Sequence, residues 1–213
     1  MNIILLGAPG SGKGTQAEKL VERMHLTQFS TGDIFRRNIS ENTPLGVEAA
    51  KYMNEGKLVP DAITNAMVEN ALQAKHDGFI FDGYPRTIEQ ADALGIMLVK
   101  LGSTIDHVIY IDVDKQILLN RIAGRVVCPK CKRSYHITSR PPKTTGICDY
   151  DQVKLERRPD DEPSKVQVRL DAYESQTAPL IDYYKNIETL IHVDAQEMDG
   201  ESVYKIIQKA ISE

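Results

Sequence analysis

The sequence contains no tryptophan, and only 6% of its 213 residues are aromatic. Its three cysteines are an odd number, so a complete set of intrachain disulfides is impossible and reduced thiols fit better. No apolar run approaches the ~20 residues that a membrane-spanning helix needs. The start of the chain shows neither the basic segment nor the cleavage site of a secretory signal. These absences predict a cytoplasmic protein.

The net charge of −4 is distributed unevenly along the chain. Residues 121–169 contain 12 Lys and Arg against 6 Asp and Glu, whereas the remaining residues contain 14 against 24. Overall acidity argues against a protein that coats nucleic acid. The local excess of arginine favours an anionic ligand bound at one place, and a solvated basic face is the alternative.

The order of apolar runs predicts an α/β fold. Four short apolar runs predict strands, at residues 2–6, 79–82, 107–113 and 190–193, and a weaker signal predicts a further strand at 27–30. None alternates cleanly, which suits a parallel sheet covered on both faces. Helical patterns lie between them, and capping signals or periodicity predict helix starts near Thr15, Thr43, Thr87, Asp114 and Ser164. The alternation implies βαβ units with right-handed crossovers.

Residues 124–161 depart from this scheme, because they follow no helical period. They contain all three cysteines, four prolines and much of the arginine. We expect a small inserted unit of short strands and turns. One domain with an insertion also fits the length of the chain, since domains typically hold ~100–200 residues.

The most informative stretch is GAPGSGKGT at residues 7–15, between the first predicted strand and a helix. Glycines let such a turn direct its backbone N–H groups at a phosphate chain, and the helix N-terminus adds the positive end of its dipole. Lys13 can then reach the outer phosphates. Gly14 follows the lysine where a hydroxyl residue is usual, and the hydroxyl comes one position later at Thr15, which puts direct metal ligation by that hydroxyl in doubt. A glycine-rich turn that binds nothing is the alternative.

Together with further strings, this loop resembles the adenylate kinase family, in particular its long bacterial form with a zinc-binding lid. The strings are STGDIFR at residues 30–36, GKLVPD at 56–61, DGYPRT at 82–87, and Arg158 with Arg169 after the insert. The resemblance covers nearly the whole chain. It implies a three-layer P-loop fold, in which helices cover a five-stranded parallel sheet that carries an inserted lid of short strands.

The same resemblance divides the chain into three parts. Residues 1–29, 60–123 and 162–213 would form the core, residues 30–59 an AMP-binding segment, and residues 124–161 the zinc-binding lid. It implies the reversible reaction MgATP + AMP ⇌ 2 ADP, which serves adenine nucleotide homeostasis, in a monomer that needs neither nucleic acid nor a membrane.

The residues themselves also suit phosphoryl transfer, in which catalysis consists mostly of positioning and charge stabilisation. Six arginines next to the motifs can each grip a phosphate with two parallel hydrogen bonds: Arg36, Arg86, Arg121, Arg125, Arg158 and Arg169. For any one of them a surface salt bridge is the alternative. The sequence shows no obvious general base, and an acceptor phosphate with a second pKa of ~6 needs none.

The resemblance assigns these and other residues to roles. The catalytic set is Lys13, Arg86, Arg121, Arg125, Arg158, Arg169 and Asp82. The predicted ATP-binding residues are Gly10, Ser11, Gly12, Lys13, Gly14, Thr15, Arg121, Arg125, Ser134, Tyr135 and Glu197. The predicted AMP-binding residues are Thr31, Arg36, Lys57, Leu58, Val59, Gly83, Tyr84, Pro85, Arg86, Gln90, Arg158 and Arg169.

Two polar residues of this set have competing interpretations. Asp82 ends an apolar strand, where the hydration shell of Mg²⁺ is a natural partner for its carboxylate, and an ordinary strand-end cap is the alternative. Gln90 is the candidate for adenine specificity, because an amide can pair with two atoms of an adenine edge. Its alternative is a capping box with Thr87, and one residue can serve both purposes.

The cysteines predict a structural metal site. Cys128 and Cys131 form a CxxC pair, and Cys148 and Asp151 follow at the same spacing, so the four side chains can complete a tetrahedron around zinc. Zinc-bearing members of the resembled family carry this pattern. His136 and Asp149 are rival fourth ligands, and a redox-active CxxC is the alternative for the motif as a whole.

Two rival functions remain open. Another nucleoside monophosphate kinase, such as one for UMP and CMP, would share most of the motifs. A P-loop NTPase that binds nucleic acid through a zinc ribbon would need a basic surface and stacking aromatics. The chain is acidic outside the insert and contains no tryptophan, which disfavours the second rival.

Overall fold

The computed structural model describes residues 1–73 and 77–212. A five-stranded parallel sheet forms its centre, with the strand order β2-β3-β1-β4-β7. The strands are β1 Ile3–Leu6, β2 Thr27–Ser30, β3 Phe79–Asp82, β4 His107–Asp112 and β7 Leu190–Asp194. All five predicted strands and the parallel α/β fold are confirmed.

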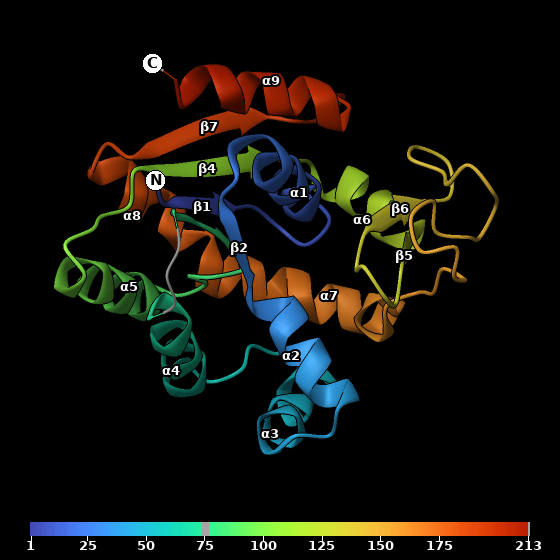
Figure 1. The fold of residues 1–213 in the computed structure, drawn as a ribbon, viewed down its shortest axis with the longest axis horizontal. Helices are drawn as coiled ribbons and strands as arrows, with labels where there is room; N and C mark the ends of the chain where they lie inside the picture. The colour runs from blue at the N-terminus through green and yellow to red at the C-terminus, as the bar shows by residue number, and fades with distance from the viewer. Residues whose placement is uncertain (74–76, 213) are drawn as a thin grey trace.

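Helices cover both faces of this sheet (Figure 1). They are α1 Lys13–Met24, α2 Thr31–Ser40, α3 Pro44–Met53, α4 Asp61–Leu72, α5 Ile88–Lys100, α6 Lys115–Ala123, α7 Pro163–Ala172, α8 Pro179–Asn186 and α9 Gly200–Ala210. A π-helical stretch at Tyr173–Thr177 joins α7 to α8.

The core explains why the strands do not alternate between apolar and polar residues. Ile3 and Leu5 of β1 lie in one buried cluster, with residues of α1, α6, α7 and α9. Ile4 and Leu6 lie in the other, with residues of α4, α5 and α8. Because both faces of the strand are covered, every position along it is apolar.

The predicted helix starts are confirmed in part. Thr43 and Thr87 are N-caps, and their hydroxyls accept hydrogen bonds from the backbone N–H groups of Gly46 and Gln90. The predicted capping box at Ser164 is wrong, because α7 begins one residue earlier, at Pro163, whose fixed φ angle suits the first helical position. Helix α1 likewise begins at Lys13 rather than at Thr15.

Two segments extend from the sheet at the ends of its strands. Helices α2 and α3 pack against each other, beyond β2. The second segment carries the antiparallel strands β5 Arg125–Val127 and β6 Ser134–His136, and a 3₁₀ turn at Pro159–Asp161 follows it. Figure 1 shows this second segment and the α2–α3 pair as separate projections. Among the described residues, no helix is both long and apolar enough to cross a membrane.

Candidate active site

The glycine-rich loop between β1 and α1 curls because its glycines adopt a left-handed backbone. Gly7 and Gly12 have φ angles of 147° and 104°, which residues with a side chain rarely adopt. A Cβ atom on Gly7 would lie 2.6 Å from Ser11 Oγ and 2.7 Å from the carbonyl oxygen of Ile111. No larger residue fits at this point, so the loop can bend tightly into the N-terminus of α1.

Lys13 is the first residue of α1 and folds back over the loop. Its Nζ donates hydrogen bonds to the carbonyl oxygens of Gly7, at 2.7 Å, and Ala8, at 3.0 Å. Burial lowers the pKa of Lys13 to about 8, although the nearby carboxylate of Asp82 opposes this shift. A phosphate group beside Lys13 would favour its charged form.

Asp82 lies at the end of β3, opposite the glycine-rich loop. Its Oδ2 accepts a hydrogen bond of 3.2 Å from Gln28 Nε2 and would lie 3.7 Å from a Cβ atom on Gly14. The position that usually carries a hydroxyl after the lysine therefore faces a carboxylate. A hydrated cation on an adjacent phosphate could use this carboxylate.

A large cavity of about 1000 Å³ opens beside the loop. Binding sites for small molecules typically have volumes of ~300–1,000 Å³, so this cavity has room for a nucleoside triphosphate. Its walls include all eleven residues predicted to bind ATP: Gly10, Ser11, Gly12, Lys13, Gly14, Thr15, Arg121, Arg125, Ser134, Tyr135 and Glu197.

Two of these side chains are held by specific partners. Arg121 donates a hydrogen bond of 3.0 Å to the carbonyl oxygen of Ala195, and its burial lowers the pKa of its guanidinium. The hydroxyl of Tyr135 lies 3.5 Å from Cys148 Sγ and accepts a hydrogen bond of 3.0 Å from the backbone N–H of Asp149. The Tyr135 hydroxyl therefore contacts the cysteine cluster.

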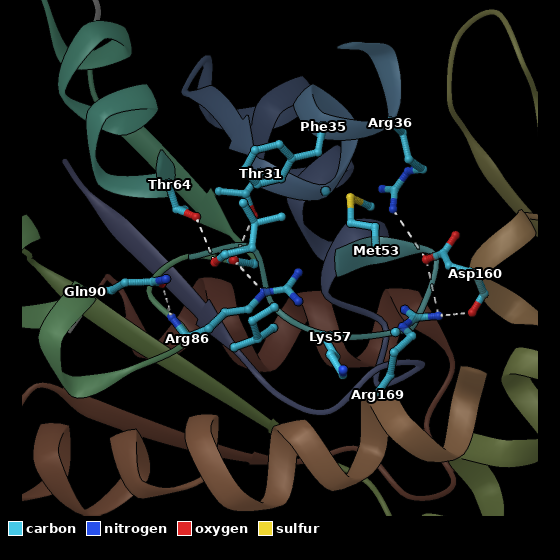
Figure 2. Close-up of a pocket in the computed structure, with 15 residues that line it drawn as sticks. Thr31, Phe35, Arg36, Met53, Lys57, Thr64, Arg86, Gln90, Asp160 and Arg169 are labelled. Atoms are coloured by element: carbon cyan, nitrogen blue, oxygen red, sulfur yellow. Dashed lines mark hydrogen bonds and ion pairs between the residues drawn. The ribbon is translucent and has the colours of Figure 1, made fainter. Parts of the chain in front are cut away.

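A second, smaller cavity lies between α2, α4 and the loop after β3 (Figure 2). Nine of the twelve residues predicted to bind AMP line it: Thr31, Arg36, Lys57, Leu58, Val59, Gly83, Arg86, Gln90 and Arg169. Pro85 and Arg158 line the large cavity instead. Tyr84 lines neither of these two cavities, because it is fully buried and its hydroxyl donates to Asn65 Oδ1 at 2.7 Å.

The two cavities meet at three arginines. Arg36, Arg86 and Arg169 line both of them. Burial and, to a lesser extent, the neighbouring charge of Arg169 lower the pKa of Arg86 to about 10, so the guanidinium stays protonated at neutral pH. The junction is therefore a concentration of fixed positive charge.

Two adjacent carboxylates hold Arg36, Arg125 and Arg169 in place. Asp161 is buried, and its two oxygens accept a hydrogen bond of 2.7 Å from Arg125 Nε and one of 3.0 Å from Arg169 Nη1. Asp160 Oδ2 forms ion pairs of 3.3 Å with Arg169 and 3.6 Å with Arg36 (Figure 2). The sequence does not reveal this role, because neither spacing nor residue type shows which arginines fold onto the two acids.

Gln90 makes hydrogen bonds with both ends of its amide. Its Oε1 accepts from the backbone N–H of Arg86 at 2.7 Å, and its Nε2 donates to Asp61 Oδ1 at 2.7 Å. Only half of the predicted capping box forms, because Thr87 caps Gln90 while the Gln90 side chain reaches Arg86 instead of Thr87. No pattern in the sequence indicates that Asp61 is a partner of Gln90.

The four predicted metal ligands lie close together in the segment that carries β5 and β6. Cys128, Cys131, Cys148 and Asp151 each offer a ligand atom, and these atoms all lie within 4.8 Å of one another. Although burial opposes the shift, hydrogen bonds, chiefly from the backbone N–H of Asp151, lower the pKa of Cys148 to about 7, whereas burial raises the pKa of Cys131. The short distances between the four ligand atoms suit a tetrahedral cation such as zinc.

The rival fourth ligands are occupied elsewhere. His136 Nδ1 accepts a hydrogen bond of 3.1 Å from the backbone N–H of Ser139. Asp149 Oδ1 accepts a hydrogen bond of 2.8 Å from the backbone N–H of Lys143. Among the rivals that the sequence left open, the geometry favours Asp151.

Ion pairs connect residues 124–161, which we call the cysteine-bearing unit, to α1. Arg133 pairs with Glu18 and Glu22, and Arg140 Nη2 lies 3.3 Å from Glu18 Oε2. The guanidinium of Arg133 also lies over the ring of Tyr150, at 3.7 Å from its centroid. These contacts form part of the wall of the large cavity, since Glu18, Glu22, Arg133 and Arg140 all line it.

Comparisons with known proteins agree with this geometry. A family model described as adenylate kinase matches residues 5–189 of the chain. The chain is 58% identical over 212 residues to an adenylate kinase of Mesoplasma florum, with 99% of this chain and 100% of the relative covered. It is 51% identical over 208 residues to an adenylate kinase of Mycoplasma capricolum, with 98% of each covered. An adenylate kinase of Clostridium perfringens is 48% identical over 212 residues, covering 97% of this chain and 98% of the relative.

Proposed function

This chain belongs to the adenylate kinase family, and we propose that it transfers the γ-phosphoryl group of ATP to AMP, reversibly, to give two molecules of ADP. The observation that carries this proposal is the junction of the two cavities. Arg36, Arg86 and Arg169 line both of them, and the glycine-rich loop with Lys13 lies in the larger. Positive charge is thus concentrated where a phosphoryl group would pass from one nucleotide to the other.

The large cavity would hold the donor nucleotide. The backbone N–H groups of the loop and the N-terminus of α1 suit the phosphate chain of ATP. Lys13 would leave the carbonyl oxygens of the loop to reach a phosphate oxygen. Arg121 and Arg125 would add fixed charge from the side of the cysteine-bearing unit, and the backbone near Glu197 would meet the adenine.

The small cavity would hold the acceptor nucleotide. Thr31 and Arg36 come from α2, the stretch from Lys57 to Val59 from the loop before α4, and Gln90 from the first turn of α5. Arg86, Arg158 and Arg169 would hold the α-phosphate in line with the γ-phosphate of the donor. No general base is needed, because the attacking phosphate oxygen already carries negative charge at neutral pH.

Adenylate kinases use Mg²⁺ with ATP, and Mg²⁺ neutralises charge on the phosphate oxygens. We infer that Asp82 faces the water shell of this ion, as its carboxylate lies across from Gly14 at the start of α1. Gly14 offers no hydroxyl to the metal.

We also propose that Cys128, Cys131, Cys148 and Asp151 hold a structural zinc ion. Three thiolates and one carboxylate complete a tetrahedron and leave no position for a substrate, so zinc would stabilise the fold rather than take part in the reaction. The residues would divide as the sequence suggests, into a core, an AMP-binding segment at 30–59 and a lid at 124–161. We infer a monomer, since one chain supplies both cavities; the cytoplasmic location stays a prediction.

The decisive experiment is to incubate the protein with MgATP and AMP and to measure ADP. GMP, UMP and CMP are tested as acceptors in parallel, and AMP should be preferred by a large factor. A preference for UMP or CMP would favour the rival kinase. If the protein instead hydrolyses ATP only in the presence of DNA or RNA and forms no ADP from AMP, the nucleic-acid-binding NTPase is favoured. A salt-dependent binding assay with DNA or RNA is the second check of that rival.

Arg86→Lys tests the junction directly. Lysine keeps the charge but loses the planar fork that binds two phosphate oxygens, so kcat should fall at least about tenfold, which corresponds to ~1.4 kcal/mol of transition-state stabilisation. Circular dichroism and thermal melting would establish that the variant is folded. A folded variant with normal turnover would remove Arg86 from the catalytic set.

A further inference from the structure

Asp61 lies outside both cavities, yet it contacts the residue that the proposed function assigns to base recognition. It belongs to the first turn of α4 and is half-buried. Its Oδ1 accepts a hydrogen bond of 2.7 Å from Gln90 Nε2, and its Oδ2 accepts one of 2.8 Å from Thr87 Oγ1. One carboxylate thus ties the start of α4 to the start of α5.

These partners determine which way the amide of Gln90 faces. An ionised carboxylate only accepts hydrogen bonds, so Nε2 must lie toward Asp61. The backbone N–H of Arg86 only donates, so Oε1 must lie toward Arg86, at 2.7 Å. A reversed amide would place a donor against the Arg86 N–H and an acceptor against the Asp61 carboxylate, which costs two hydrogen bonds in a buried place.

The orientation of the amide has a chemical consequence in the small cavity. Gln90 lines that cavity (Figure 2), and its amide keeps one N–H and one oxygen lone pair for a ligand. Adenine carries an amino donor at the position where guanine carries a carbonyl acceptor. An amide fixed in one orientation can therefore match one of these purines and must oppose the other.

We infer that Asp61 is a positioning residue for base selection: it fixes the orientation of the Gln90 amide and so sets the preference of the acceptor site for adenine over guanine. This inference rests on the proposed function, in which Gln90 meets the base of the acceptor nucleotide. Thr87 supports it, because its hydroxyl donates to Asp61 while accepting from the backbone N–H of Gln90 at 3.1 Å. The Thr87 hydroxyl thereby holds the Asp61 carboxylate in contact with the Gln90 amide.

The test compares AMP with GMP as acceptors, at saturating MgATP, in the full-length chain. In Asp61→Ala, the ratio of kcat/KM for AMP to kcat/KM for GMP should fall about tenfold, mostly through KM for AMP, and KM for ATP should stay within about twofold. Asp61→Asn keeps an oxygen that can accept from Gln90 and should retain the ratio within about threefold. Asp61→Ser, whose hydroxyl suits a helix N-terminus, is the second variant should Asp61→Ala not fold, and its ratio should fall in the same direction.

Glu69→Ala provides the matched control, because Glu69 is an exposed acid on the same helix. Its ratio should equal that of the unmodified protein. The double variant Asp61→Ala with Gln90→Ala isolates the coupling. If Asp61 acts through Gln90, replacing Asp61 should no longer change the AMP-to-GMP ratio once Gln90 is alanine.

The outcomes separate this inference from the function beneath it. An unchanged ratio in folded Asp61→Ala or Asp61→Ser, or an equal fall with and without Gln90, overturns the role of Asp61 while ADP formation from ATP and AMP stands. If Asp61→Ala lowers the melting temperature but leaves the AMP-to-GMP ratio unchanged, Asp61 only stabilises the packing of α4 against α5. If Gln90→Ala itself leaves the ratio unchanged, the assignment of Gln90 fails and this inference with it.

Discussion

The α2–α3 segment and the cysteine-bearing unit both project from the same sheet, but different forces hold them together. In the α2–α3 segment, Phe35, Ala49 and Val59 form a small buried cluster, to which partly buried side chains such as Tyr52 and Met53 add. The backbone N–H groups at the starts of these helices are capped locally, by the hydroxyls of Ser30 and Thr43. Apolar packing of two helices is therefore enough to hold this segment.

The cysteine-bearing unit has much less apolar material. Its buried cluster consists of Cys128, Tyr135, Cys148 and Leu155, so two of the four residues are cysteines. Strands β5 and β6 have only three residues each. The proposed metal ion would supply the stability that this small core lacks, whereas the helical pair has an apolar cluster of its own.

The largest expected effect comes from removing the metal. After treatment with a chelator, or in Cys148→Ser, hydrogen exchange of residues 124–161 should rise on the order of 100-fold or more, because metal binding supplies folding free energy to this unit. Exchange in α2 and α3 should not change, and the overall melting temperature should fall. Asp151→Ala should weaken metal binding less than Cys148→Ser does.

Activity distinguishes a structural metal from a catalytic one. Some ADP formation should survive at low temperature in the chelated protein. If the chelated protein kept an ordered lid but lost all transfer, and zinc alone restored it, the metal would be catalytic and the contrast between the two segments would lose its basis.

The packing of α2 on α3 can be tested at Gly46. A Cβ atom here would lie 2.0 Å from the carbonyl oxygen of Asn38, so Gly46→Ala must push the two helices apart. Overpacking of this kind typically costs ~1–3 kcal/mol. We expect a lower free energy of unfolding in urea and a higher KM for AMP, with KM for ATP unchanged.

Gly95→Ala is the matched control for this substitution. Gly95 lies in α5, and a Cβ atom there would meet nothing within 4 Å. Alanine in an open helical position should stabilise the protein by ~0.5–1 kcal/mol. Equal effects of the two substitutions would mean that close packing does not hold the α2–α3 segment.

A pH titration sharpens the comparison between the donor and acceptor sides. Because burial lowers the pKa of Lys13 to about 8, this side chain loses its charge as the pH rises above 8. ATP affinity should then fall, by up to about tenfold per pH unit. The pKa of Arg86 is about 10, so AMP affinity should change little between pH 7 and 9. Isothermal titration with each nucleotide measures both.

The titration of Lys13 has the opposite effect on the free energy of unfolding, which rises with pH where ATP affinity falls. Since the pKa of Lys13 is lower in the folded protein than in the unfolded chain, the unfolded chain binds more protons between the two values. The Lys13 contribution to the free energy of unfolding therefore rises as the pH increases above 8. ATP affinity that stayed constant from pH 7 to 9 would contradict the role given to Lys13.

The smallest expected effect concerns the ion pairs between the cysteine-bearing unit and α1. Glu18→Gln removes the charge that Arg133 and Arg140 share, and such pairs are worth ~0.2–1 kcal/mol near a surface. KM for ATP should rise by roughly two- to fivefold at low salt and less at high salt. Glu22 is half-exposed, so Glu22→Gln should have a weaker effect. An effect of Glu18→Gln on AMP alone would disprove the assignment.

Much of the fold was predictable because its signals are local. Strand β1 is an unbroken apolar run and β3 and β4 are mostly apolar, whereas β2 contains only one apolar residue, Phe29. The glycines and lysine of the loop lie between a strand and a helix. The predictions of helix starts were less accurate, since Thr43 and Thr87 cap helices while Ser164 does not. At Ser164 the neighbouring Pro163 determines the start instead, and the pattern of hydroxyl and amide alone cannot show this.

By itself the sequence determined the parallel sheet, the phosphate-binding loop and the set of cysteines, because each follows from residues that are close together along the chain. Only the tertiary structure decided that Asp160 and Asp161 hold Arg36, Arg125 and Arg169. It also decided that Asp61 holds the amide of Gln90. Charged and polar side chains choose partners by distance and burial in the folded chain, and residue spacing carries no record of either.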